Sequence, residues 1–80
     1  MSDDALRAEV RAVLVEALAL DADRMPAVLD VDHVESWDSL GHMMVIEALE
    51  ARFGQAIGHG AALSLLSEDA ILAYLRTRRG

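Results

Sequence analysis

Apolar residues in this 80-residue chain recur at spacings of three and four, and this pattern restricts the fold to helices packed around one core. The first such series runs from Asp3 to about Leu20, where Asp3 and Asp4 suit the start of a helix. Its apolar members are Leu6, Val10, Val13, Leu14, Ala17 and Leu18. Residues that favour strands do not form alternating runs, so the sequence predicts an amphipathic helix here and no sheet.

A second helix is predicted from Asp38 or Ser39 to Phe53, with Gly54 as its C-terminal stop. Between the first two helices, from Asp21 to Asp38, the periodicity fails. We expect a long loop there, with one helical turn after Pro26, held down by apolar residues of its own. Those apolar residues are Val28, Leu29, Val31, Val34 and Trp37.

Two further elements are predicted towards the C-terminus. After Gly58 and Gly60, the apolar segment Ala61 to Leu66 has room for one or two turns of helix. Ser67, followed by two acidic residues, is a typical N-cap for a last helix that runs through Leu75 to the closing arginines. The fold class predicted is therefore all-α: one domain over residues 1–80, a small four-helix bundle with three principal helices, a short third helix and a long first loop.

Composition limits the chemistry that the chain can perform. The absence of cysteine excludes disulfides, zinc-thiolate sites and a cysteine nucleophile. There is no leader with an apolar segment and no apolar run long enough to span a membrane, so we expect a cytoplasmic protein. The net charge of −7 predicts repulsion of nucleic acid and anionic lipid, and attraction to basic patches on protein partners. Acidity that serves only to keep a small domain in solution is an open alternative.

The second helix, in the stretch ESWDSLGHMMVIEALEARFG, carries two apolar faces. At about 100° per residue, one arc forms the natural core face. It contains His42, Val45, Ile46, Leu49 and Phe53. The opposite side contains Leu40, Met43, Met44, Glu47 and Ala51. We expect Leu40 and Met44 to be exposed for contact with a partner, whereas for Met43 both exposure and cover by a neighbouring segment stay open.

Ser39 lies where the second helix begins. Unpaired amide groups and the positive end of the helix dipole would stabilise a phosphate diester attached to its hydroxyl. Asp38 would repel such a group, so the role that fits it is the N-cap, which accepts backbone N–H bonds. An ordinary helix cap explains the tripeptide Asp-Ser-Leu equally well when it is taken alone.

With its context, this stretch resembles the acyl carrier protein family, including the peptidyl and aryl carriers of modular synthesis. The family pattern is Asp-Ser-Leu at the start of the second helix, aliphatic residues along it, and Phe or Tyr at its end. Here the pattern is matched by Asp38, Ser39, Leu40, Val45, Ile46, Leu49 and Phe53. The resemblance extends over nearly the whole chain, through the long acidic loop, the short third helix and the AILAYL pattern of the last helix.

The resemblance implies a non-catalytic carrier. Ser39 would bear 4′-phosphopantetheine, transferred from coenzyme A by a phosphopantetheinyl transferase. The arm would hold an acyl or aminoacyl group as a thioester and present it to a loading enzyme and to a downstream acyltransferase or synthase. Docking would use Leu40, Met43, Met44 and Glu47. With its spare apolar face used in this way, the carrier is expected to be a monomer, and its extent from Met1 to just past the last helix suggests a free-standing one.

Two positions depart from the carriers of housekeeping fatty-acid synthesis, which usually have an acid after the motif leucine and another further along the helix. This chain has Gly41 and Met44 there. The sequence of this helix resembles more closely that of discrete carriers of polyketide or nonribosomal peptide biosynthesis.

Three rival interpretations use the same residues. A hydrolase built on Ser39, His42 and Asp38 is disfavoured, because Asp38 cannot orient His42 from the same turn and His42 should face the core, near Trp37. A metal site at Asp30, Asp32, His33 and Glu35 lacks the spacing of a calcium loop. The alternative from another class is an unmodified acidic helical interaction or adaptor module, in which Ser39 only begins a helix.

Overall fold

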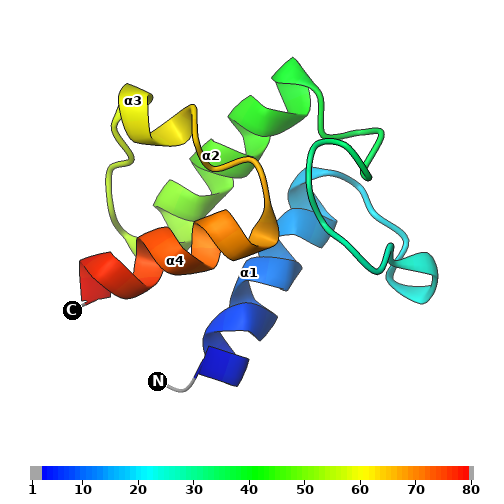
Figure 1. Ribbon diagram of the computed structural model, residues 1–80, viewed down its shortest axis with the longest axis horizontal. Helices are drawn as coiled ribbons and strands as arrows, with labels where there is room; N and C mark the ends of the chain where they lie inside the picture. The colour runs from blue at the N-terminus through cyan, green and yellow to red at the C-terminus, as the bar shows by residue number, and fades with distance from the viewer. Residues whose placement is uncertain (1–2, 80) are drawn as a thin grey trace.

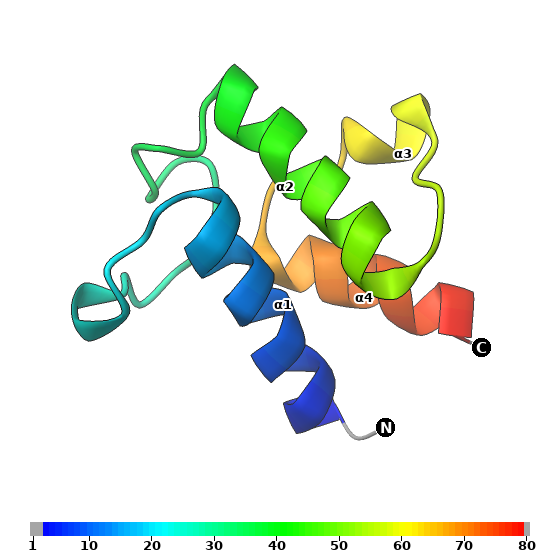
Figure 2. The same cartoon turned by 180° about the vertical axis from the view of Figure 1, so that it is seen from behind.

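The computed structural model describes residues 3–79 and is a small all-α bundle, as predicted. The helices are α1 (Asp3–Ala17), α2 (Ser39–Phe53), α3 (His59–Ala62) and α4 (Glu68–Arg79). Helix α1 packs against both α2 and α4 (Figures 1 and 2). The short α3 lies beside α2, on the side away from α1, and the long loop between α1 and α2 closes the end of the bundle opposite the C-terminus.

One hydrophobic core holds these elements together. Its most enclosed side chains, each less than 2% exposed, come from α1, α2 and α4. They are Val10, Leu14, Val45, Leu49, Ile71, Leu72 and Leu75. The single-domain prediction covered residues 1–80, of which 1, 2 and 80 lie outside the described part. Within residues 3–79, no helix is both long and apolar enough to cross a membrane.

The predicted bounds of the second and last helices are confirmed. Helix α2 ends at Phe53, and Gly54 follows in the left-handed conformation with φ 64°, its amide bonded to the carbonyl of Glu50 at 2.9 Å. Helix α4 begins after Ser67, whose hydroxyl accepts the amide of Ala70 at 3.0 Å.

The short third helix lies two residues earlier than predicted, at His59–Ala62 rather than within Ala61–Leu66. The chain turns immediately after it, with the amide of Ser64 bonded to the carbonyl of Ala61 at 3.0 Å. This turn brings Leu65 into the core, where it is 2% exposed. Burial of Leu65 is favourable and accompanies the end of the helix at Ala62.

The loop from residue 21 to 38 contains a helical turn, but on the other side of Pro26 from the one predicted. The 3₁₀ turn η1 spans Ala22–Arg24. The carboxylate of Asp21 caps it by accepting the amide of Asp23 at 2.9 Å. This local cap favours the turn before Pro26, whereas the predicted helical turn after Pro26 is not formed and residues 27 and 28 make a bend instead.

The same loop is pinned to the bundle by its own apolar residues. Leu29, Val34 and Trp37 are each no more than 4% exposed, whereas Val28 remains 49% exposed. Backbone hydrogen bonds add to this: the amide of Val31 donates to Leu66 at 3.1 Å, and the amide of Glu68 donates to Leu29 at 2.8 Å. The loop is therefore long but fixed, as the density of apolar residues within it suggested.

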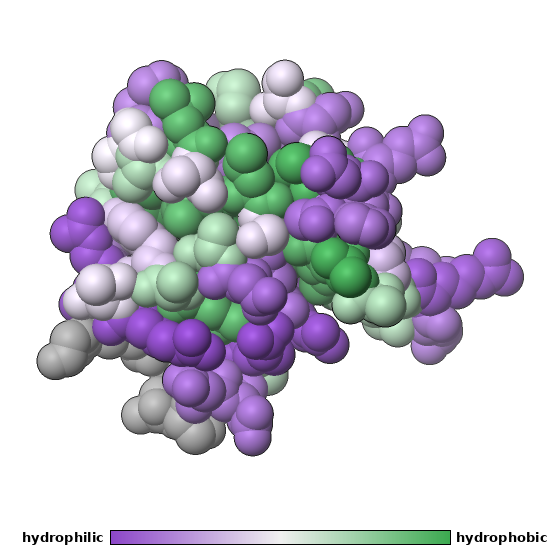
Figure 3. Space-filling model, viewed as in Figure 1, coloured by the Kyte–Doolittle hydropathy of each residue, from purple (hydrophilic) through white to green (hydrophobic). Residues whose placement is uncertain are grey.

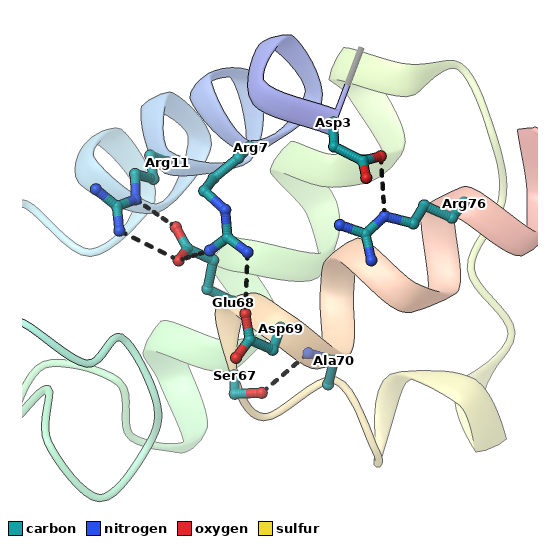
Figure 4. Close-up of polar contacts among 8 residues, drawn as sticks. All are labelled: Asp3, Arg7, Arg11, Ser67, Glu68, Asp69, Ala70 and Arg76. Atoms are coloured by element: carbon teal, nitrogen blue, oxygen red, sulfur yellow. Dashed lines mark hydrogen bonds and ion pairs between the residues drawn. The ribbon is translucent and has the colours of Figure 1, made fainter. Parts of the chain in front are cut away.

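Glu68 joins the loop and α4 to α1 (Figure 4). Its side chain is 7% exposed and accepts from Arg7 at 2.5 Å and from Arg11 at 2.6 Å, two residues one turn apart on α1. The hydrogen bond and the charge of Glu68 raise the pKa of Arg11 above its ordinary value. A buried carboxylate without such partners would be costly, so the two arginines make its burial possible.

We expect Glu68→Gln to lower the free energy of unfolding by about 2 kcal/mol, because two charge-assisted hydrogen bonds lose their acceptor charge at a buried position. Urea unfolding measures the change. The matched control is Asp69→Asn, since Asp69 pairs with Arg7 at 3.3 Å but is 84% exposed, and should lose under about 0.5 kcal/mol. Equal losses in the two variants would contradict the role given to burial.

Helix α1 ends at Ala17, three residues before the predicted end at Leu20. Ala19 adopts φ 53°, the amide of Leu20 donates to Val15 at 2.9 Å, and the amide of Ala19 donates to Glu16 at 3.4 Å. This is a Schellman termination with alanine where glycine is usual. The apolar period of the sequence continues past this point, which explains why the end was predicted too late.

Replacing Ala19 by glycine should raise the free energy of unfolding by up to about 1 kcal/mol, because glycine adopts a left-handed conformation without a Cβ penalty. The reciprocal change, Gly54→Ala, should lower it by a similar amount, since Gly54 has φ 64° and no neighbour that an added methyl would contact. Urea unfolding of the two variants tests both signs. A destabilised Ala19→Gly variant would show that the cap is not strained.

Candidate functional site

The start of α2 is built by Asp38. This residue has extended backbone angles, and its Oδ1 accepts the amide of Gly41 at 2.9 Å while its carbonyl accepts the amide of His42 at 2.8 Å. Asp38 is thus the N-cap that the sequence predicted. Ser39 is the first helical residue and is exposed. Its side chain therefore stands at the rigid end of a helix, beside amides that have no partner within that helix.

The hydroxyl of Ser39 differs from the other serine and threonine hydroxyls that the structure describes. Four more serine and threonine hydroxyls lie within residues 3–79, and each is hydrogen-bonded to the backbone: those of Ser36, Ser64, Ser67 and Thr77. Among the serine and threonine residues of that part of the chain, Ser39 alone has a hydroxyl without an intramolecular hydrogen bond; the hydroxyl of Tyr74 also has none, but it is buried. An exposed hydroxyl with no bond to break is accessible to an incoming reagent.

Gly41 brings the first turn of α2 into contact with the loop. A Cβ at this position would lie 2.2 Å from the carbonyl oxygen of Ser36 and 3.0 Å from a methyl of Leu18. Ser36 is itself held, because its hydroxyl donates to the carbonyl of Leu18 at 2.9 Å. No side chain fits at position 41 without a shift of the loop, which gives a packing reason for the glycine.

His42 connects α2 to both of its neighbours. The indole N–H of Trp37 donates to Nδ1 of His42 at 3.1 Å, and Nε2 of His42 lies 2.7 Å from the carbonyl oxygen of Ala62. An indole N–H can only donate, so Nδ1 is the acceptor and Nε2 carries the proton that Ala62 receives. The rings of Trp37 and His42 also stack, at 6.4 Å between centroids.

Because both ring nitrogens of His42 are engaged, neither is available to activate Ser39. The prediction that His42 packs in the bundle beside Trp37 is confirmed. Asp38 likewise uses its carboxylate on Gly41 rather than on the imidazole. The three residues of the rival hydrolase interpretation are close in the sequence, but the structure does not join them as nucleophile, base and orienting acid.

The outer side of α2 presents the residues proposed for docking. Leu40 is 68% exposed, Met43 61% and Met44 47%, and Glu47 is exposed beside them. These four residues, here called the α2 face, lie within one arc of the helix and adjoin Ser39. Exposure of Leu40 and Met44 was expected, and Met43, for which two alternatives were open, is exposed as well.

Two exposed leucines that the sequence analysis did not single out lie in the α3–α4 connection. Leu63 is 64% and Leu66 41% exposed. The hydropathy surface in Figure 3 shows apolar side chains across its upper half, between α3 and the start of α2, with hydrophilic side chains along the lower edge. Both leucines belong to the apolar run 61–66 of the sequence. The helix predicted for that run led us to expect more of its side chains to be buried.

Two hollows flank α2. A groove of about 580 Å³ lies between α1 and α2. Apolar and small residues form its floor, and Glu16, Glu47 and Arg52 form its rim. A second hollow of about 520 Å³ lies against the long loop, with Asp38 at its edge and Arg24 among its lining residues. Both are open to solvent.

The acidic loop makes a local turn around Asp30. One oxygen of Asp30 accepts the amides of Asp32 and His33, at 3.0 and 2.8 Å, and lies 2.6 Å from Nδ1 of His33. The side-chain hydrogen bond with His33 holds the pKa of Asp30 below its ordinary value. No group of three or more potential metal ligands is gathered in the described part of the chain, this loop included.

Comparison of the chain with protein-family models and with curated proteins finds no match.

We expect Gly41→Ala to lower the free energy of unfolding by about 2 kcal/mol, because the added methyl would overlap a backbone carbonyl that cannot move freely. Gly60→Ala is the matched control, since nothing lies within 4 Å of a Cβ at position 60. Urea unfolding compares the two. A Gly41→Ala variant as stable as its control would show that the loop can shift away from α2 without a loss of stability.

Proposed function

We propose that this protein is an acyl carrier protein in which Ser39 bears 4′-phosphopantetheine. The observation that carries the proposal is the Ser39 hydroxyl, which is exposed and unbonded at the first residue of α2, while the other described serine and threonine hydroxyls are bonded to the backbone. The all-α bundle and the Asp-Ser-Leu motif at this place support the same interpretation.

The residues at the start of α2 suit the attached group. Transfer forms a bond between Oγ of Ser39 and the phosphorus of coenzyme A that bears the pantetheine. It breaks the diphosphate linkage, releases adenosine 3′,5′-bisphosphate and leaves the serine proton to a base of the transferase. The diester so formed lies at the positive end of α2, close to amides of its first turn. Asp38 already shares its charge with the amide of Gly41, which lessens its repulsion of the diester.

A carrier also needs a thiol, and this chain has no cysteine. The arm supplies one when bound, and with it the thioester that holds an acyl or aminoacyl cargo. Tethering raises the effective concentration of that cargo at each docked enzyme. The protein's own residues fix the origin of the arm and present the α2 face, so the chain has no catalytic residue in this proposal.

The partners would be a phosphopantetheinyl transferase, a loading enzyme and a downstream acyltransferase or synthase. We propose that they dock on Leu40, Met43, Met44 and Glu47, where exposed apolar side chains meet an acidic rim. Gly41 and Met44, which replace acids, favour partners of polyketide or nonribosomal peptide biosynthesis over those of housekeeping fatty-acid synthesis. A cytoplasmic monomer is the form proposed.

The second candidate is an unmodified interaction module that uses the same α2 face. The exposed Leu40, Met43 and Met44 favour it as much as they favour a carrier. The two functions differ at Ser39: a carrier loses its function when the hydroxyl is removed, whereas a module keeps its binding.

The intact mass of the protein, before and after incubation with coenzyme A and a promiscuous phosphopantetheinyl transferase, tests the proposal. We expect a gain of one phosphopantetheine, and no gain in the Ser39→Ala variant. Ser64→Ala is the matched control, because Ser64 is also exposed but its hydroxyl donates to the carbonyl of Ala61 at 2.9 Å. It should be modified like the wild type. No gain with several transferases, on folded protein, would favour the interaction module.

A further inference from the structure

We infer that the bundle is closed on both sides of Ser39, so that a cargo attached there stays outside the core, and that the cargo is a short or polar acyl or aminoacyl group rather than a long alkyl chain. The part that concerns cargo rests on the proposed carrier function. The part that concerns the closed bundle rests on the contacts around the first turn of α2.

On the α1 side, the first turn of α2 is closed by backbone packing. A single methyl at Gly41 would lie 2.2 Å from the carbonyl oxygen of Ser36, so a chain of methylene groups cannot pass there. The segment it would have to displace is held by the hydroxyl of Ser36, bonded to Leu18, and by Leu18 itself, which is 3% exposed.

On the α3 side, the first turn is closed by a hydrogen-bonded side chain. His42 accepts from Trp37 and donates to Ala62, and so joins the loop, α2 and α3. Trp37 is 3% exposed, so nearly all of its surface lies out of contact with water. An alkyl chain that entered between α2 and α3 would separate these polar groups and leave them without partners in an apolar surrounding, which is unfavourable.

The core beneath these contacts is filled. Val45 and Leu49, the next inward residues of α2, are 0% and 1% exposed, and they meet side chains of α1 and α4 that are equally enclosed. The hollows of about 580 and 520 Å³ are open and have charged rims. An alkyl chain gains little from such sites, because shelter from water is what would favour its burial.

The exposed apolar residues beside Ser39 complete the argument. Leu40 and Met43 project outward on the side where the arm would begin. A long alkyl chain held outside the core would extend this apolar surface and promote association between copies. A short or polar cargo adds little to it, and this cargo is therefore the one that a closed bundle can carry without aggregation.

The closed bundle can be tested without the arm, because the chain has no cysteine. The Ser39→Cys variant would be labelled with methyl or octyl methanethiosulfonate, each of which forms one disulfide at that position. We expect the two products to have the same methyl NMR shifts for Val45 and Leu49 and the same urea midpoint, with octyl effects confined to Leu40 and Met43. Octyl-dependent shifts at Val45 or Leu49, or at Val13 in the α1–α2 groove, would overturn the inference.

A double variant tests whether His42 closes the α3 side of the first turn. In Ser39→Cys/His42→Ala, octyl should shift the methyl signals of Val45, because the α3 side is then open. Ser39→Cys/Trp37→Phe keeps an aromatic ring at position 37 but removes the N–H donor and part of the indole volume, and it serves if the alanine variant does not fold. No octyl effect on Val45 in a folded variant would overturn the role given to His42.

The cargo is tested on protein loaded with acetyl- or octanoyl-phosphopantetheine by a transferase, with loading verified by mass. We expect hydroxylamine to cleave the two thioesters at the same rate within about twofold, since a difference of that size is less than 0.5 kcal/mol. A slower octanoyl reaction would overturn this inference but not the proposed carrier function. Failure of both loading reactions would instead be a failure of the carrier function, with the labelling result still deciding whether the bundle is closed.

Discussion

The carboxylate of Glu68 holds three segments of the chain at one point. Its oxygens accept from Arg7 and Arg11 of α1, its amide donates to Leu29 of the long loop, and its own residue begins α4. Burial of an acid is unfavourable unless its charge is matched, so this arrangement admits one relative placement of the three segments. The loop, which has little secondary structure of its own, is placed by α4 and by its buried apolar residues.

From that junction the loop reaches the start of α2 in a fixed position. Val34 and Trp37 are buried, Ser36 is bonded to Leu18, and Asp38 caps the helix. If Ser39 is modified as proposed, this support would matter, because it gives the hydroxyl a constant place for a transferase to recognise. The rigidity lies beneath Ser39, whereas the surface around Ser39 is open and apolar.

The residues beside Ser39 have structural roles that their residue types alone do not indicate. His42 has the chemistry of a base, yet both its nitrogens serve to connect the loop, α2 and α3. Gly41 is the place where α2 and the loop come closest. Close packing at Gly41 and the hydrogen bonds of His42 thus hold the bundle together next to the proposed modification site. Position on the helix separates the two groups: Gly41 and Val45 face inward, whereas Leu40, Met43 and Met44 face outward, where we propose that partners dock.

The sequence by itself determined the helices, their caps at Asp38 and Ser67, the stop at Gly54 and the exposure of Leu40 and Met44, because spacing, capping and angular position depend only on near neighbours in the chain. The end of α1 at Ala17 and the turn before Pro26 rest on local hydrogen bonds that the apolar period does not mark. Only the tertiary structure decided the place of α3 and the pairing of Glu68 with two arginines about sixty residues away. These depend on which distant groups meet, and a helical period carries no information about such contacts. The free hydroxyl of Ser39 depends on both the sequence and the tertiary structure. Its motif is local, but its lack of a partner is known only once the surrounding groups have been placed.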